Sequence, residues 1–237
     1  MASVLIVKTG ETLPSVAARR GDFEQWIASG LGLAAGQIRV VRVDAGEPLP
    51  DPDETVGVVV TGSSAMVSER RPWSETTASW LAVAVGRQTP VLGICYGHQL
   101  LAHALGGRVG RNPLGRQIGT VDVALGAEAA GDELLGGLVP VVRVQASHVE
   151  AVLALPAGAT LLGSTSLDPH HAFRIGSSAW GVQFHPEFDA DIMRGYLNAR
   201  REIILSEGID VDALLAAVSQ TDDGVAVLRR FSEMLPL

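Results

Sequence analysis

The sequence predicts an α/β fold with a mainly parallel central sheet, helices on both faces and a smaller strand-rich part. Two observations carry this prediction. In the first hundred residues, short β-branched runs alternate with longer helical patterns. Each run is also apolar throughout, as in strands that are buried on both faces. The strands expected here are "SVLIVKT", "IRVVRVD", "VGVVVTG" and "PVLGIC", at 3–9, 38–44, 56–62 and 90–95.

Helices are expected around 14–30 and 73–87, and from about 97 to 105, because apolar residues there recur at helical spacing. The pattern then changes, since short strands separated by turn residues follow in quick succession. This predicts a partly antiparallel arrangement whose last strand returns to the main sheet. The expected strands are 120–125, 141–147, 159–165, 171–176 and 180–185.

The C-terminal part is expected to be helical. One helix is predicted at about 189–205, and two more lie in the remaining segment, with Thr221 as a candidate N-cap. One apolar face of the last helix is formed by Val225, Leu228, Phe231 and Leu235. Because no linker rich in Gly, Ser and Pro divides the chain, we expect one domain over 1–237, with a helical extension at about 206–237.

Composition excludes several classes of function. The chain has 237 residues, is 47% hydrophobic and carries a formal net charge of -8. A negative protein is poorly suited to nucleic acid or to an anionic membrane, so neither is expected as a partner. The apolar run Val4 to Val7 is too short for a signal peptide or a membrane span. A single cysteine cannot form an intrachain disulfide, and we therefore expect a cytoplasmic protein.

Cys95 stands in "GICYGHQ", between an expected buried strand and an expected helix. Glycines two residues on either side of it are typical of a sharp strand-turn-helix elbow, where the backbone is crowded. The thiol would then lie at a helix N-terminus, where the helix dipole favours the thiolate and free amides can face an oxyanion. The alternative is a cysteine that packs as a small apolar residue.

A cysteine nucleophile needs a histidine base and a carboxylate that orients it. Four of the six histidines have simple structural interpretations. These are His98, His103, His170 and His171. The first would brace the turn after Cys95, the second would pack or lie on the surface, and the last two would lie in a polar turn. The two that remain as candidates are His148 and His185.

The stretch "FHPEF" places His185 at the end of an expected strand and Glu187 two residues further on. Side chains two apart on a strand share a face, so the carboxylate can hold one ring nitrogen while the other addresses a thiol. The alternative is a solvated His and Glu at a strand end. No metal is expected, because His-x-Glu lacks further ligands at a recognisable spacing.

Taken together, "GICYGHQ" and "FHPE", ninety residues apart and in this order, resemble the class I (triad-type) glutamine amidotransferases. The resemblance extends from the first strand to about residue 200 and implies a flavodoxin-like glutaminase fold. It implies that Cys95 is the nucleophile, His185 the general base and acid, and Glu187 the orienting carboxylate.

The same resemblance implies further site residues. "TGSS" matches the family's glycine-containing loop, so the amides of Gly62 and Tyr96 would be the oxyanion donors. Gln99 matches the glutamine-contacting position of Gly-His-Gln, and "ASHVE", with Ser147 and His148, resembles the Ser-His loop of the substrate pocket. The alternatives are an ordinary turn glycine and a polar hairpin end. Many relatives have paired glycines and a proline in the first loop and Gly-Asp after Ser-His, so the exact substrate stays open.

By this resemblance we expect a cysteine-dependent amide hydrolase that releases ammonia from glutamine through a γ-glutamyl thioester. No nucleotide-binding loop is present, so no cofactor is expected and a separate synthetase would supply the acceptor. The alternatives are a free-standing γ-glutamyl peptide or amide hydrolase and a non-catalytic regulatory module of the same fold. An intact Cys-His-Glu set disfavours the last, since a binding module has no chemical need for it.

Overall fold

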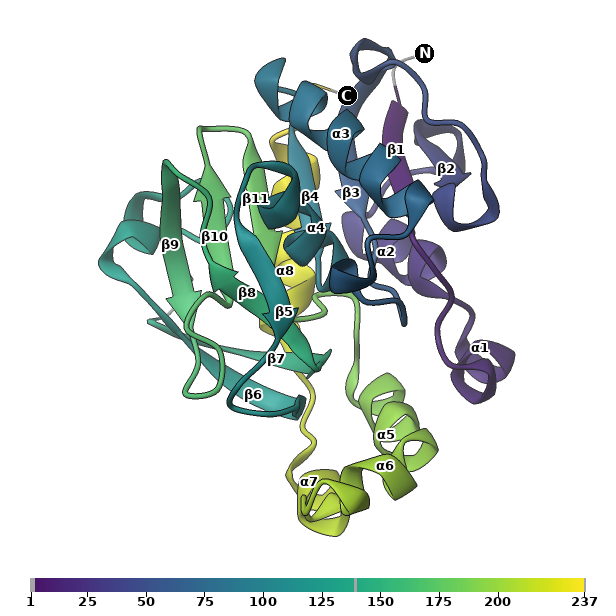
Figure 1. The fold of residues 1–237 in the computed structure, drawn as a ribbon, viewed down its shortest axis with the longest axis vertical. Helices are drawn as coiled ribbons and strands as arrows, with labels where there is room; N and C mark the ends of the chain where they lie inside the picture. The colour runs from purple at the N-terminus through teal and green to yellow at the C-terminus, as the bar shows by residue number, and fades with distance from the viewer. Residues whose placement is uncertain (1–2, 139, 237) are drawn as a thin grey trace.

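The computed structural model describes residues 3–138 and 140–236. Within them, nine strands form one sheet in the order β2-β1-β3-β4-β11-β10-β9-β6-β7 (Figure 1). The first five are mutually parallel, and the last four run antiparallel to their neighbours. The predicted fold class is therefore confirmed. The parallel strands are β1 (Ser3–Lys8), β2 (Ile38–Arg42), β3 (Thr55–Val60), β4 (Val91–Ile94) and β11 (Ala179–Val182).

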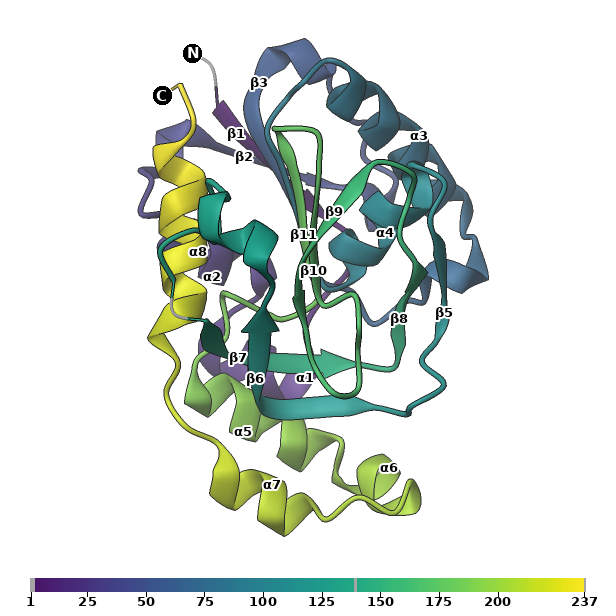
Figure 2. The ribbon, with the colours of Figure 1, turned by 90° about the vertical axis from the view of Figure 1, so that its left-hand side faces the viewer.

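Helices cover both faces of the parallel sheet, as Figure 2 shows with the strands seen nearly edge-on. On one face lie α2 (Phe23–Leu31) and α8 (Asp222–Glu233), which pack so closely that a Cβ at Gly30 would come 2.3 Å from Leu228 Cδ1. On the other lie α3 (Pro72–Gly86) and α4 (Tyr96–Ala104). The alternating side chains of the buried strands fill two apolar layers, one on each side of the sheet.

The strand-rich part extends the sheet with β6 (Gln117–Leu125), β7 (Val141–His148), β9 (Ala159–Ser164) and β10 (Ala172–Ile175). As predicted, the last strand returns to the main sheet, because β11 pairs in parallel with β4. A separate antiparallel pair, β5 (Arg108–Arg111) with β8 (Glu150–Ala154), was not expected. Its first strand, "RVGR", is short and carries a charge at each end, so its sequence lacks a strand pattern.

Two expected helices are each divided in the structure. Gly21, with φ 79°, ends α1 (Pro14–Arg20), and Asp22 caps α2, so the helix expected at 14–30 is wrong as one element. The helix expected at 189–205 breaks at Arg200 into α5 (Ala190–Ala199) and α6 (Arg201–Ser206). The short 3-10 helices are Ala35–Gln37, Val43–Ala45, Pro52–Glu54, Val67–Glu69 and Ala127–Gly131.

The two predicted C-terminal helices are present as α7 (Val211–Ala217) and α8. Thr221 occupies the N-cap position of α8, but its side chain makes no capping hydrogen bond, so the predicted cap is only partly right. The buried face of α8 contains Val227 beside Leu228 and Phe231, whereas Val225, which was predicted to lie in this face, is only partly buried. Figure 1 shows that α5, α6 and α7 lie together beyond the end of the sheet, next to α1.

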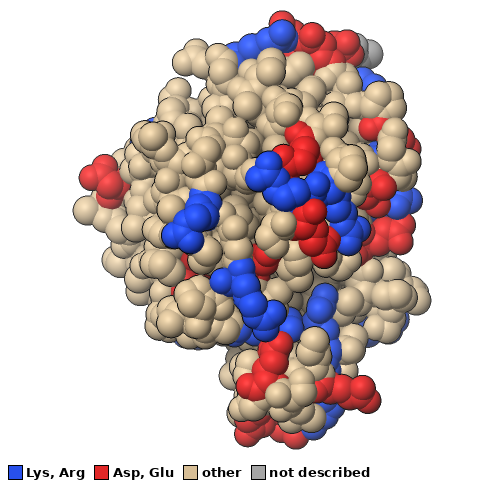
Figure 3. Space-filling view, in the orientation of Figure 1, with Lys and Arg blue, Asp and Glu red and all other residues tan. Residues whose placement is uncertain are grey.

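No helix in the described ranges is both long and apolar enough to cross a lipid bilayer. On the face drawn in Figure 3, basic and acidic side chains are interspersed, as expected from the many arginine–carboxylate pairs of the surface. This mixed pattern differs from the continuous basic face that binds phosphate backbones.

Candidate active site

The carboxyl ends of β3, β4 and β11 meet at one edge of the sheet, where open parallel sheets bind their ligands. Cys95 follows β4 directly and has φ 52° and ψ -98°, a strained backbone for a residue with a side chain. A Cβ at Gly93 would come 2.4 Å from the Gly97 carbonyl oxygen, and one at Gly97 would come 2.4 Å from the Val60 carbonyl oxygen. The predicted elbow geometry is thus confirmed, and both glycines are required by backbone crowding.

His185 lies just beyond the end of β11 and beside Glu187. The strand expected at 180–185 ends at Val182, because its partner β4 turns away into the elbow. His185 instead forms an isolated bridge with Gln145. The ring Nδ1 donates to Glu187 Oε1 at 2.7 Å. The imidazole stacks on Phe188 with ring centroids 4.0 Å apart, which fixes its plane. The structure therefore gives the His-Glu contact expected from "FHPE", although the two residues are not on a regular strand.

The charges around His185 favour its protonated form. Burial alone would lower the pKa of His185, but the carboxylate of Glu187 and the sulfur of Cys95 oppose this and raise it to about 10. The hydrogen bonds of the ring to Cys95 and Glu187 act in the same direction. The arrangement thus favours a charged imidazolium beside the sulfur of Cys95, as the histidine partner of a cysteine nucleophile requires.

Gly62 and Tyr96 lie next to this pair. The Gly62 carbonyl accepts from the hydroxyls of Thr9 and Thr61, at 3.0 and 2.9 Å, which fixes the loop after β3. A Cβ at Gly62 would come 2.8 Å from His185 Cε1, so only glycine fits against the ring. Tyr96 begins α4, where backbone amides lack helical acceptors. The Tyr96 amide thus directly follows Cys95 at a helix start, and Gly62 packs against the His185 ring. Their role as oxyanion donors stays a prediction.

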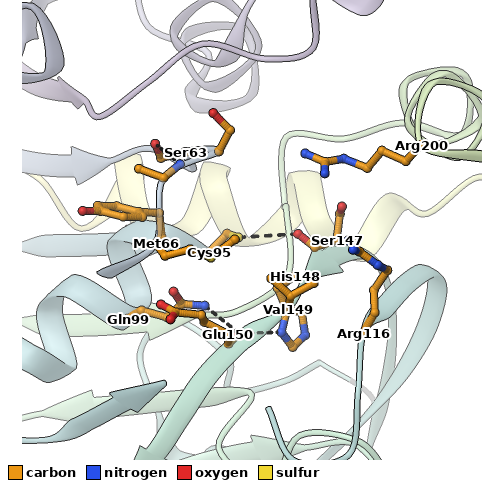
Figure 4. A pocket seen from close by; sticks show the side chains of 13 residues that line it. Ser63, Met66, Cys95, Gln99, Arg116, Ser147, His148, Val149, Glu150 and Arg200 are labelled. Atoms are coloured by element: carbon orange, nitrogen blue, oxygen red, sulfur yellow. Dashed lines mark hydrogen bonds between the residues drawn. The ribbon is translucent and has the colours of Figure 1, made fainter. Parts of the chain in front are cut away.

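The expected substrate-binding residues Gln99, Ser147 and His148 all line the hollow beside Cys95 (Figure 4). The Gln99 amide donates to the Glu150 carbonyl at 2.8 Å, and the Cys95 thiol faces the Ser147 carbonyl oxygen at 3.8 Å. The His148 ring is buried and donates from Nδ1 to the Glu150 carbonyl at 2.9 Å. Its ring therefore braces the wall of the hollow from behind.

Three charged residues of this hollow were not singled out from the sequence: Glu150, Arg116 and Arg200. Glu150 is buried, and its carboxylate accepts from the hydroxyl of Ser68. Arg116 donates through Nε and Nη2 to both oxygens of Glu207, at 2.7 and 2.9 Å. Glu150 directly follows Ser-His-Val, and this position could have drawn attention to it. The two arginines stand in no motif, so the sequence contains no signal for them.

A second group of buried polar residues lies behind His148. Burial lowers the pKa of His148 to about 4, and the nearby His171 adds to this effect. His171, expected in a polar turn, is fully buried, with Nδ1 3.4 Å from Asp168 Oδ2. One ligand atom from each of His148, Asp168 and His171 lies within 4.8 Å of the other two, so these side chains form the one group of the described residues with the spacing of metal ligands.

The fold and the site together define a class of protein. The model of the family "Glutamine amidotransferase class-I" matches residues 20–199, and the chain belongs to this family. A glutamine amidotransferase from Thermotoga maritima has the same fold, with a TM-score of 0.76 and 22% identity over 98% of this chain and 97% of that one.

Two curated relatives differ in what they are named for. GMP synthase [glutamine-hydrolyzing] from Aeropyrum pernix is 36% identical over 185 residues, which cover 78% of this chain and 32% of that protein. Gamma-glutamyl peptidase 4 from Arabidopsis thaliana is 31% identical over 73% of this chain and 70% of that protein. This chain therefore spans about a third of the length of the first relative and more than two thirds of the second.

Proposed function

We propose that this protein hydrolyses a γ-glutamyl amide through a thioester at Cys95, with glutamine as the first candidate substrate. The observation that carries the proposal is the buried His185–Glu187 pair beside a cysteine on a strained elbow at a helix N-terminus. A packing cysteine would need neither the strained backbone nor a charged histidine next to it.

In the proposed reaction the Cys95 thiolate attacks the γ-carbonyl carbon, and the amides of Gly62 and Tyr96 stabilise the oxyanion. The C–N bond breaks as His185 gives its proton to the departing nitrogen. His185 then takes a proton from water, which attacks the thioester and releases glutamate. Glu187 holds the ring through Nδ1, so that Nε2 exchanges the proton with the substrate and the water.

The amino-acid end of the substrate would lie in the hollow beside Gln99. The buried carboxylate of Glu150 matches a substrate ammonium, and Ser147 offers polar groups next to the sulfur. Ammonia released from glutamine would pass to a separate acceptor protein. The name of the GMP synthase relative supports this proposal, because it combines glutamine hydrolysis with a synthesis.

A free-standing γ-glutamyl peptide hydrolase is the second candidate, and it uses the same catalytic residues. It is favoured by Arg200, a cation that lines the catalytic hollow, because an ammonia leaving group has no anionic group that Arg200 could bind. The similarity to Gamma-glutamyl peptidase 4 over most of both chains agrees with this candidate.

Chemical labelling tests the shared chemistry. An electrophilic glutamine analogue should add one label per chain at Cys95, which is the only cysteine and leaves no rival thiol. Cys95→Ser should abolish turnover and labelling while thermal unfolding shows a folded protein. Full activity in Cys95→Ser would contradict the proposal, and a wild-type chain that is neither labelled nor active on any γ-glutamyl compound would favour a non-catalytic module.

A second measurement addresses the acceptor. If the protein supplies ammonia, the isolated chain should hydrolyse glutamine weakly and should speed up when a separate ATP-using synthetase is added. Efficient cleavage of a γ-glutamyl peptide by the isolated chain, with glutamine a much poorer substrate, would favour the second candidate.

A further inference from the structure

Arg200 is a cation in the wall of the catalytic hollow that has no acidic partner in the described ranges 3–138 and 140–236. Its Nε is buried and makes no hydrogen bond there. The neighbouring arginines differ, since Arg116 pairs with Glu207 and Arg201 pairs with Asp212. Because a buried charge without a partner is unfavourable, such a group is expected where a ligand supplies the opposite charge.

The surroundings of Arg200 strengthen this point. Burial lowers the pKa of Arg200, and the positive charge of Arg116 adds to the effect, while Tyr196 and Cys95 oppose it. The guanidinium also lies 5.9 Å from the centre of the Tyr196 ring. In Figure 4 the guanidinium of Arg200 lies above Ser147, and the side chain of Arg116 approaches Ser147 from below. An anion bound beside Ser147 would therefore meet the unpaired charge of Arg200, because the charge of Arg116 is neutralised by Glu207.

Arg200 lines the hollow into which the leaving group would depart. Two hollows meet at Cys95: one is lined by Gln99, His148 and Glu150, the other by Phe23, His185 and Tyr196. Arg200 lines both. In the proposed reaction the departing nitrogen takes its proton from His185, so the leaving amine must occupy the second hollow, between His185 and Arg200.

We propose that Arg200 binds the carboxylate of an amino-acid leaving group, so that the preferred substrates are γ-glutamyl amino acids or short γ-glutamyl peptides. This inference rests on the proposed thioester chemistry at Cys95 and, of the two candidate substrates, favours the γ-glutamyl peptide over glutamine. The carboxylate of such a leaving group is two bonds from the departing nitrogen, and the planar fork of arginine suits it. Ammonia has no group that could use this charge.

The bond changes are those of a simple hydrolysis. The sulfur of Cys95 forms a bond to the γ-carbonyl carbon, the C–N bond breaks, and the nitrogen leaves as a free amino acid with the proton from His185. Water then cleaves the thioester to glutamate, which restores the thiolate–imidazolium pair. No oxidant, reductant or nucleotide takes part, so the isolated chain should complete the cycle.

The test compares two substrates that differ only in the carboxylate: γ-glutamylglycine and γ-glutamylmethylamide. Wild-type protein should prefer γ-glutamylglycine in kcat/KM, and Arg200→Gln should reduce this preference on the order of tenfold to a hundredfold, mainly through KM. Arg200→Lys should retain part of the preference, because the charge remains but the fork is lost. Arg201→Gln is the matched control, since it removes the same charge one residue further on, and it should leave the preference unchanged.

Three outcomes would overturn the inference. Wild-type protein could show no preference for γ-glutamylglycine, or Arg200→Gln could leave the preference intact. Equal losses on both substrates would instead indicate that Arg200 binds the glutamyl part. In each of these cases glutamine hydrolysis and labelling at Cys95 still test the proposed function. A failure of the proposed function can therefore be distinguished from a failure of this inference.

Discussion

The end of β11 and the end of β7 each place a buried histidine near Cys95, and the two histidines carry opposite pKa shifts. His185 contacts Glu187 at 2.7 Å and neighbours the sulfur, and its pKa is raised to about 10. His148 is as deeply buried, but the nearest carboxylate, Asp168, lies 3.9 Å from its Nε2 and also serves His171. Its pKa is lowered to about 4 by burial and by His171.

The difference shows that burial alone makes a histidine neutral and that a carboxylate in direct contact reverses this effect. The region after β11 is thus prepared for proton transfer. The region after β7 instead provides a neutral, hydrogen-bonded wall behind Ser147.

The largest effect is expected from removing the charged histidine. His185→Ala should lower turnover on the order of a thousandfold or more, because both the thiolate partner and the proton donor are lost. Steady-state hydrolysis of glutamine and of γ-glutamylglycine measures this. His103→Ala, which removes a partly exposed histidine paired with Glu75, is the control and should leave turnover unchanged. Unchanged activity in His185→Ala would make His148 the base and overturn the comparison.

Glu187→Gln should have a smaller effect, on the order of a hundredfold, since the base remains but loses its charged partner. The sign of the pH effect follows from the raised pKa of His185. Without the carboxylate this pKa falls, so the imidazolium is lost at a lower pH and the alkaline limb of the kcat/KM profile moves to lower pH. A profile unchanged from the wild type would show that Glu187 does not set the charge of His185.

The smallest effect concerns stability in acid. Burial lowers the pKa values of His148 and His98 to about 4 and about 3, below the ordinary value of 6.5. The unfolded chain therefore binds more protons than the folded one as the pH falls below about 6.5, and the free energy of unfolding decreases over that range. We expect the Tm to fall on the order of 5 °C between pH 7 and pH 5.

Thermal unfolding followed by circular dichroism across this range measures the effect. His148→Gln, which keeps a hydrogen-bonding side chain without a titrating group, should show a shallower fall. His185 acts in the opposite direction, because a raised pKa contributes stability below about pH 6.5 that is lost as the pH rises toward 10. A Tm that does not change between pH 7 and pH 5 would contradict the neutral, buried state of His148.

Much of the fold followed from the sequence because its signals are local. The apolar β-branched runs became β1 to β4, and the alternation with helices correctly predicted a parallel sheet covered on both faces. The helix breaks at Gly21 and Arg200 were missed. At Gly21 the break depends on a positive φ that glycine permits but does not require. The pair β5–β8 was missed because a short strand is defined by its partner.

The sequence by itself determined the catalytic candidates, since the crowding between Gly93 and Gly97 and the closeness of His185 to Glu187 act over a few residues. Only the tertiary structure decided which further side chains reach Cys95. Arg116 and Arg200 come from distant segments, and their difference depends on Glu207, which packs against one guanidinium and not the other. Whether a cation is neutralised or left for a ligand is fixed by the long-range packing of carboxylates, and neither composition nor spacing along the chain contains that information.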